Sequence, residues 1–128
     1  MSEYGLYKDL KLDVDLAEQK ISEELKKEGF GVLTRIDMSA KFKEKLGIDY
    51  KKYIILGACN PPFAHKAVEA EENIGLLLPC NVIIYETGTG VRVGIIKPSA
   101  AMSMVENPVL NNIAIQIEQK LKSALDRL

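Results

Sequence analysis

The two cysteines carry the most reactive side chains of this sequence, and each stands in a distinctive setting. Cys59 ends an apolar run and is followed by an Asn-Pro pair, so it is predicted to close a strand just before a helix. Amides at a helix N-terminus favour a thiolate over a thiol. Cys80 follows Pro79 at the predicted start of another strand, and His65 is the one histidine of the sequence. Cys59 and Cys80 are therefore the candidate catalytic residues.

Three kinds of chemistry remain open for these residues if the two cysteines meet. Both thiols can be small buried apolar groups, as free cysteines often are. Cys59 can instead be a redox-active or nucleophilic thiol with Cys80 as its resolving partner. The third alternative is a metal such as zinc, bound by Cys59, Cys80 and His65, although zinc sites usually use three or four protein ligands. The spacing matches neither a C-x-x-C redox motif nor a paired zinc motif.

Whether the cysteines meet depends on the direction of the strand that begins near Cys80. A helix over residues 61–72 carries the chain back along the sheet by about 18 Å. Residues 73–79, if extended, can cover about 25 Å and reverse that travel. We therefore expect the strand after Cys80 to run antiparallel to the strand before Cys59. Both cysteines would then lie at the same end of the sheet.

The periodicity of the apolar residues predicts alternating strands and helices. Strands are expected over residues 4–12, 32–38, 50–58, 82–86 and 91–97, and helices over residues 16–28, 39–46, 61–72 and 107–128. Asp13 or Asp15 can cap the first helix, and Glu18 stands three residues after Asp15 as in a capping box. Asn60 is expected to cap the third helix. The order β-α-β-α-β-α-β-β-α predicts an α+β fold whose mixed or mostly antiparallel sheet has helices packed mainly on one face.

Three segments resemble a known protein family. They are residues 30–37 (FGVLTRID), 55–61 (ILGACNP) and 75–82 (GLLLPCNV). Together they make the chain similar to the bacterial and archaeal domain of unknown function 302 family over nearly its whole length. The resemblance implies a small α+β domain that is commonly a homodimer, and it implies no activity, substrate or catalytic residue. It also places six residues at signature positions: Cys59, Asn60, Pro61, Pro79, Cys80 and Asn81.

Length, net charge and hydrophobic content limit the kinds of protein that this sequence can encode. The chain has 128 residues, a formal net charge of −1 and 47% hydrophobic residues, which fits one globular domain over residues 1–128. This charge balance gives no general attraction to nucleic acid, and no apolar stretch is long enough to span a membrane. The first residues lack the layout of a signal peptide, so a cytoplasmic protein with reduced cysteines is expected. The lysines at positions 41, 43, 45, 51 and 52 are interpreted as a solvated face.

These observations lead to one main functional hypothesis and one alternative. The main hypothesis is a pocket for a small-molecule ligand at one end of the sheet, and its ligand-binding residues are Cys59, Asn60, Pro61, Pro79, Cys80 and Asn81. Helix N-terminal amides at Phe63 and Ala64 would be available to an anionic group. The alternative is a non-catalytic homodimeric interaction module in which the cysteines are only core residues. Whether the protein is an enzyme is left open.

Overall fold

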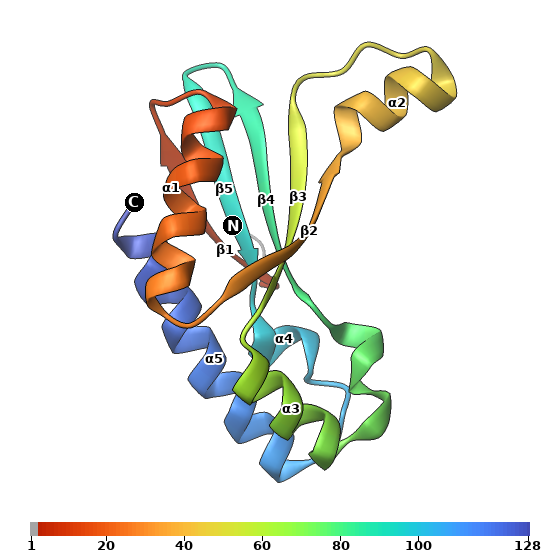
Figure 1. Ribbon diagram of the computed structural model, residues 1–128, viewed down its shortest axis with the longest axis vertical. Coiled ribbons are helices and arrows are strands. Elements are labelled where there is room, and N and C mark those ends of the chain that lie inside the picture. Colours follow the sequence, from red (N-terminus) through yellow and green to blue (C-terminus); the bar gives the residue numbers. More distant parts are fainter. Residues whose placement is uncertain (1–2) are drawn as a thin grey trace.

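The protein is built on one antiparallel sheet, described by a computed structural model for residues 3–128 (Figure 1). Its strands are β1 (Gly5–Leu10), β2 (Gly31–Asp37), β3 (Tyr53–Cys59), β4 (Cys80–Thr87) and β5 (Gly90–Ile96). They lie in the order β1-β5-β4-β3-β2, and every neighbouring pair is antiparallel. The predicted α+β class and element order are confirmed, and β3 lies inside the sheet as its apolar run indicates.

The helices connect these strands. They are α1 (Val14–Lys27), α2 (Met38–Leu46), α3 (Pro61–Ala70), the 3-10 helix η1 (Glu72–Leu77), the short α4 (Pro98–Ala101) and α5 (Pro108–Asp126). Asp13 caps α1 by accepting a hydrogen bond from the amide of Leu16 at 2.8 Å. The capping box at Asp15 and Glu18 is therefore wrong. Glu18 instead pairs with Arg35 on β2 at 2.7 Å.

One face of the sheet is covered by α1 and α5, which lie side by side against it (Figure 1). Alternate residues of the inner strands point into this core, and Leu56 and Ile84 are fully buried there. The predicted apolar stripe of α5 is confirmed, because seven of its residues are buried: Leu110, Ile113, Ala114, Ile117, Leu121, Ala124 and Leu125. The stripe packs within the chain, so α5 covers the sheet.

A second, smaller hydrophobic cluster lies beyond the end of the sheet. There α3, η1 and α4 pack on the N-terminal part of α5, with Ile74, Met102 and Leu110 at the centre. Neither η1 nor α4 is predicted from the sequence, and residues 73–79 are expected to be extended. That expectation is wrong, since Glu72–Leu77 forms η1. A 3-10 helix rises about 2 Å per residue, so the segment still returns the chain to the sheet.

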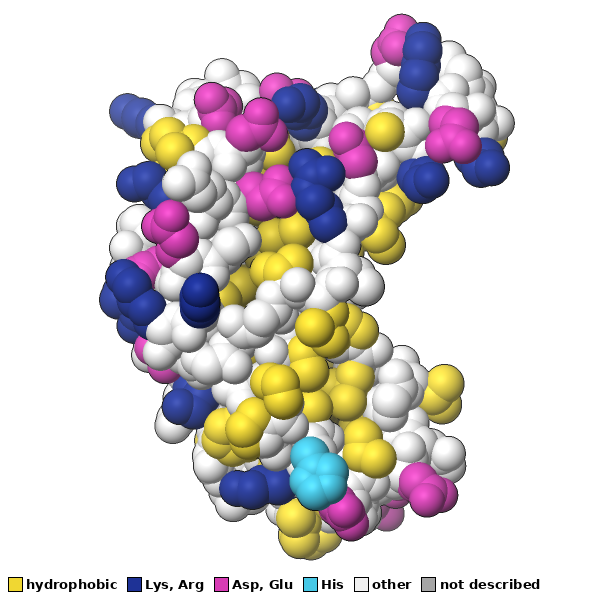
Figure 2. Space-filling model, viewed as in Figure 1, with side chains coloured by type: hydrophobic (Ala, Val, Ile, Leu, Met, Phe, Trp, Pro, Cys, Tyr) yellow, Lys and Arg dark blue, Asp and Glu magenta, His cyan; other side chains and the backbone are white. Residues whose placement is uncertain are grey.

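The other face of the sheet is largely uncovered, and α2 projects beside it (Figure 1). No residue of α2 is buried, and the edge strand β2 is exposed along nearly its whole length. Figure 2 shows hydrophobic side chains reaching the surface in the concave side between α2 and α3. Within residues 3–128, none of the helices combines the length and apolar character that a membrane-spanning segment needs.

Candidate functional site

The antiparallel pairing of β3 and β4 brings both cysteines to the same end of the sheet. Ala58 pairs with Cys80 in the register of these strands, so Cys59 is one residue beyond the partner of Cys80. The predicted strand direction is confirmed. Both cysteines are free thiols.

Strand alternation gives the two thiols different surroundings. Cys80 shares a face with its partner Ala58, and both are buried against the helices. Cys59 is the next residue along β3, so its side chain starts from the opposite face, and it is half-buried. Cβ atoms that start from opposite faces are poorly placed for a disulfide without movement of the backbone. Cys59 is therefore the accessible thiol and Cys80 the enclosed one.

An apolar pocket of about 240 Å³ opens at this end of the sheet. It lies at the junction of the two hydrophobic clusters, where the strand ends, α3 and α5 do not fully fill the space. Its lining residues are Phe30, Leu33, Ala58, Cys59, Asn60, Ala64, Ala67, Leu78, Pro79, Cys80 and Ile117. We call it the Cys59 pocket. Four of the six predicted ligand-binding residues line it.

Asn60, which lines this pocket, is hydrogen-bonded to the end of α1. Its side-chain amide donates a hydrogen bond to the Glu28 carbonyl at 3.1 Å, and it makes no cap bond to α3. Asn60 is thus the N-cap residue of α3 by position, as predicted, but its side chain is hydrogen-bonded to the Glu28 carbonyl at the end of α1 and supplies no cap bond. The next residue, Gly29, has φ +87, and an added Cβ there would lie 3.1 Å from Asn60 Nδ2.

The Ala64 amide is not available to an anion, contrary to expectation. It donates to the Asn60 carbonyl at 2.9 Å in the first turn of α3. The lining of the Cys59 pocket consists mainly of hydrocarbon side chains, since Asn60 is its one amide side chain and no charged residue contributes. The arrangement therefore suits an apolar ligand better than an anionic one.

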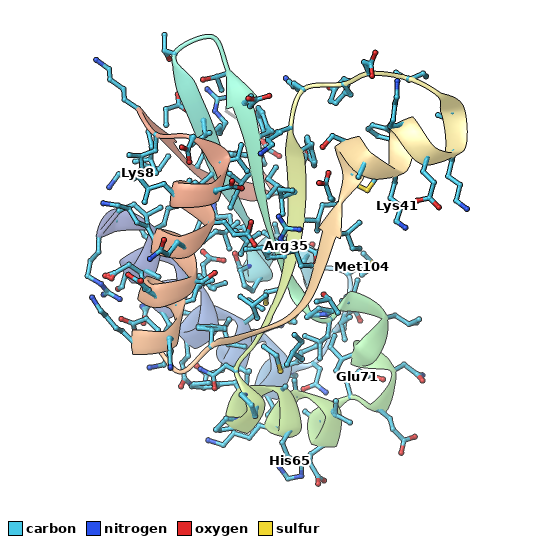
Figure 3. All side chains as sticks on the ribbon, turned by 45° about the horizontal axis from the view of Figure 1, so that its top comes forward. Lys8, Arg35, Lys41, His65, Glu71 and Met104 are labelled. Carbon is cyan, nitrogen blue, oxygen red and sulfur yellow. The ribbon has the colours of Figure 1, made fainter. Side chains whose placement is uncertain are left out.

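The remaining predicted residues lie outside the Cys59 pocket. Pro61 is the first residue of α3 and is exposed. Asn81 pairs with Gly57 and lies on the face opposite to Cys80. His65 is 76% exposed in its side chain, points away from the protein and pairs with Glu69 at 3.1 Å (Figure 3). Alternation along β4 and the helical turn of α3 separate these residues from the pocket.

The structure thus does not bring His65 together with the two cysteines as a set of metal ligands. Across residues 3–128, no three side chains of the metal-binding types His, Cys, Asp and Glu converge. The cysteines are the only two such residues in the lining of the Cys59 pocket.

Burial controls the chemistry of the enclosed thiol. Burial, with a smaller contribution from the neighbouring Cys59, raises the pKa of Cys80 from 9.0 to about 11. A buried thiol in apolar surroundings is unfavourable as a thiolate. Cys80 is therefore a neutral thiol at neutral pH, which makes it a poor resolving nucleophile.

Sequence reasoning missed the hydrocarbon part of the site. Phe30 and Leu33 lie at the entry to β2 and within it, whereas Ile117 lies far away in the sequence on α5, and each carried only a signal for its own element. Ala64 and Ala67 belong to the helix predicted over residues 61–72, but nothing in the sequence indicated that small residues there leave space. No local motif encodes an unfilled junction between two clusters.

Comparisons with known proteins place this geometry in a family. The sequence model of the family described as "Domain of unknown function DUF302" matches residues 6–128. The chain belongs to this family. A crystal structure of an uncharacterized conserved DUF302 protein from Bacillus stearothermophilus is 31% identical, with 98% of each chain covered and a TM-score of 0.91. A comparison with curated proteins gives no match. The resemblance to DUF302 proteins drawn from the three motifs is thus confirmed.

Proposed function

We propose that this DUF302 domain binds a small, mainly apolar molecule in the Cys59 pocket. The observation that supports this is the pocket itself, which is apolar, about 240 Å³ in volume and lined by both cysteine-bearing segments. A dry apolar cavity of about 150 Å³ can hold benzene, so this volume suits a single ring or a short aliphatic chain. Ligand sites are typically apolar hollows with a few polar groups that fix orientation.

Cys59 is the residue expected to meet the polar or reactive part of such a ligand. It is half-buried and lines the pocket, whereas Cys80 is enclosed and neutral. A redox pair has less support, because alternation separates the two side chains and Cys80 resists ionisation. A metal site has less support as well, because His65 lies elsewhere on α3.

The proposal predicts that a small aromatic probe enters the Cys59 pocket. Toluene added to protein labelled with ¹³C in its alanine methyl groups should shift the signals of Ala58, Ala64 and Ala67 in a saturable way. Ala64→Leu should weaken this binding by about tenfold or more, because its added side chain occupies the space. NMR titration provides the measurement.

Val68→Leu serves as the matched control, since Val68 lies on the exposed side of the same helix. It should bind toluene as the wild type does. Chemical denaturation of both variants would verify that they fold, because overpacking costs about 1–3 kcal/mol. Toluene binding that Ala64→Leu leaves unchanged, or no saturable shift in the wild type, would overturn the proposal.

A second candidate function, homodimeric association, has one specific observation in its favour. The edge strand β2 presents its outer backbone groups, and some of its apolar side chains are exposed, with Leu33 66% and Ile36 41% exposed. Native proteins usually cover or charge such an edge, because it is a template for strand pairing. We propose that β2 of a second copy pairs with this edge.

Association through β2 predicts twice the chain mass in sedimentation equilibrium. Val32→Lys, on the same strand, should weaken the association by about tenfold or more, because a charge would enter the paired edge. Leu76→Lys is the control, since Leu76 is 88% exposed on η1, away from β2. A monomeric wild type, or equal weakening by both variants, argues against this candidate.

A further inference from the structure

A second hollow, separate from the Cys59 pocket, lies between α2 and the uncovered face of the sheet. It has a volume of about 400 Å³ and is lined by Met38, Phe42, Tyr50, Tyr53 and Ile55. We call it the α2 hollow. Tyr53 and Ile55 belong to the face opposite to the buried residues Ile54 and Leu56, so the hollow opens away from the core. It shares no lining residue with the Cys59 pocket.

The aromatic rings of the α2 hollow are arranged to hold a flat ring. Phe42 meets Tyr50 edge to face, with centroids 5.5 Å apart and an interplanar angle of 86°. Tyr53 stacks on Tyr85 of β4, with centroids 5.4 Å apart and an angle of 5°. Three aromatic side chains thus contribute to the lining, and edge-to-face and stacked arrangements are the two that aromatic pairs prefer. A planar aromatic group fits this lining better than a branched aliphatic one.

Lys51 carries a positive charge beside the hollow. Lys51 Nζ lies 4.8 Å from the centroid of the Tyr85 ring and 5.8 Å from that of Tyr50. The neighbouring Lys43 and Lys52 each pair with a carboxylate. Over residues 3–128, by contrast, Lys51 has no ion pair with a carboxylate, and its contacts are with rings.

The other cation on this face is already neutralised. Arg92 binds both oxygens of Asp9, at 2.6 and 3.0 Å. The strand register places four residues in one row across the sheet, in the order Tyr53, Tyr85, Arg92 and Asp9. The Arg92–Asp9 ion pair therefore lies at the end of this row that is farther from the hollow. The unpaired ammonium group of Lys51 can balance a ligand with one negative charge. It would balance only one of the two charges of a phosphate dianion.

We propose that the α2 hollow binds a small planar aromatic acid carrying one negative charge, with its ring against Phe42 and Tyr53 and its carboxylate toward Lys51. The partner is a free small molecule, since the hollow is bounded on one side by α2 and its lining is large enough for a fused ring. This site is independent of the proposed function of the Cys59 pocket.

The Tyr53 hydroxyl is suited to such a ligand. Burial is the main cause that raises its pKa above 10.0, and Tyr85 contributes in the same direction. The hydroxyl therefore remains protonated at neutral pH and is able to donate a hydrogen bond to a carboxylate. Tyr53 thus adds a neutral hydrogen-bond donor to the residues that line the α2 hollow.

The test uses 2-naphthoate as the anionic probe and 2-naphthamide as its uncharged analogue. Signals of the Met38 methyl and the Ile55 δ-methyl report occupancy of the hollow by NMR titration. The wild type should bind 2-naphthoate more tightly than the amide by about tenfold, because a hydrogen bond to a charged group is worth more than a neutral one. Lys51→Met should remove this difference, so that acid and amide bind alike.

Lys45→Met is the matched control, because Lys45 is on α2 and contacts Glu44 rather than the rings. It should leave the preference for the acid unchanged. Four results would overturn the proposal: no saturable shift at Met38 and Ile55, equal binding of acid and amide by the wild type, a preference that survives Lys51→Met, or shifts confined to the alanines of the Cys59 pocket. The last result would also assign the probe to the site of the proposed function, so the two proposals fail separately.

Discussion

Replacing Leu121 with alanine is expected to lower the free energy of unfolding by about 2–5 kcal/mol. Leu121 is fully buried in the middle of α5 and belongs to the main core cluster. Its removal costs the transfer free energy of the side chain and leaves a cavity, since this part of α5 belongs to the main core cluster that packs on the sheet. Urea denaturation followed by circular dichroism measures this loss.

Leu76→Ala is the matched control for this substitution. It removes the same atoms from a side chain that is 88% exposed on η1, so its effect should stay within about 0.5 kcal/mol. A loss below about 1 kcal/mol for Leu121→Ala would contradict the packing of α5 on the sheet. It would mean that the apolar residues of α5 pack mainly against something other than the sheet.

Stability is expected to fall as pH rises from about 9 to 11, in part because of one buried thiol. The pKa of Cys80 is about 11 in the folded protein against 9.0 for an ordinary cysteine. In this interval the unfolded chain binds fewer protons at Cys80 than the folded chain, so the free energy of unfolding decreases with pH. A difference of two pKa units corresponds to about 2–3 kcal/mol, lost between pH 9 and 11.

Other groups titrate in the same range, so the difference between variants is the measurement. Denaturation curves at pH 8, 9, 10 and 11 should show a smaller decrease for Cys80→Ala than for the wild type. Cys59→Ala should largely retain the decrease, because Cys59 is half-buried and only the secondary cause of the raised pKa. If Cys80→Ala keeps the full decrease, the thiol is not held neutral by burial.

Much of the fold could be predicted from the local pattern of apolar residues. The spacing of apolar residues predicted the helix over residues 107–128, which is α5. It also predicted strands over residues 82–86 and 91–97, which form the hairpin of β4 and β5 that Thr87 and Gly90 close. These features follow from periodicities that each element expresses along its own sequence, so they do not require knowledge of distant contacts.

Two of the errors concern polar side chains near helix N-termini. Asp13 and Asp15 are both able to cap a helix, and the position of Arg35 on β2 decided what Glu18 does. Asn60 has the sequence of a cap, but the carbonyl of Glu28 lies within reach only once α1 and β3 are packed. Such choices depend on partners that are far away in sequence.

For the site, the sequence determined the reactive groups and the tertiary structure decided their setting. The two cysteine-bearing motifs alone indicated one site, and the lengths of the intervening segments indicated that Cys59 and Cys80 lie at one end of the sheet. Only packing decided that Cys80 is enclosed, that His65 and Asn81 point elsewhere, and that an apolar space remains beside Cys59. The physical reason is that spacing along the chain fixes which residues are able to meet, whereas burial and empty volume depend on how separate elements fill space together.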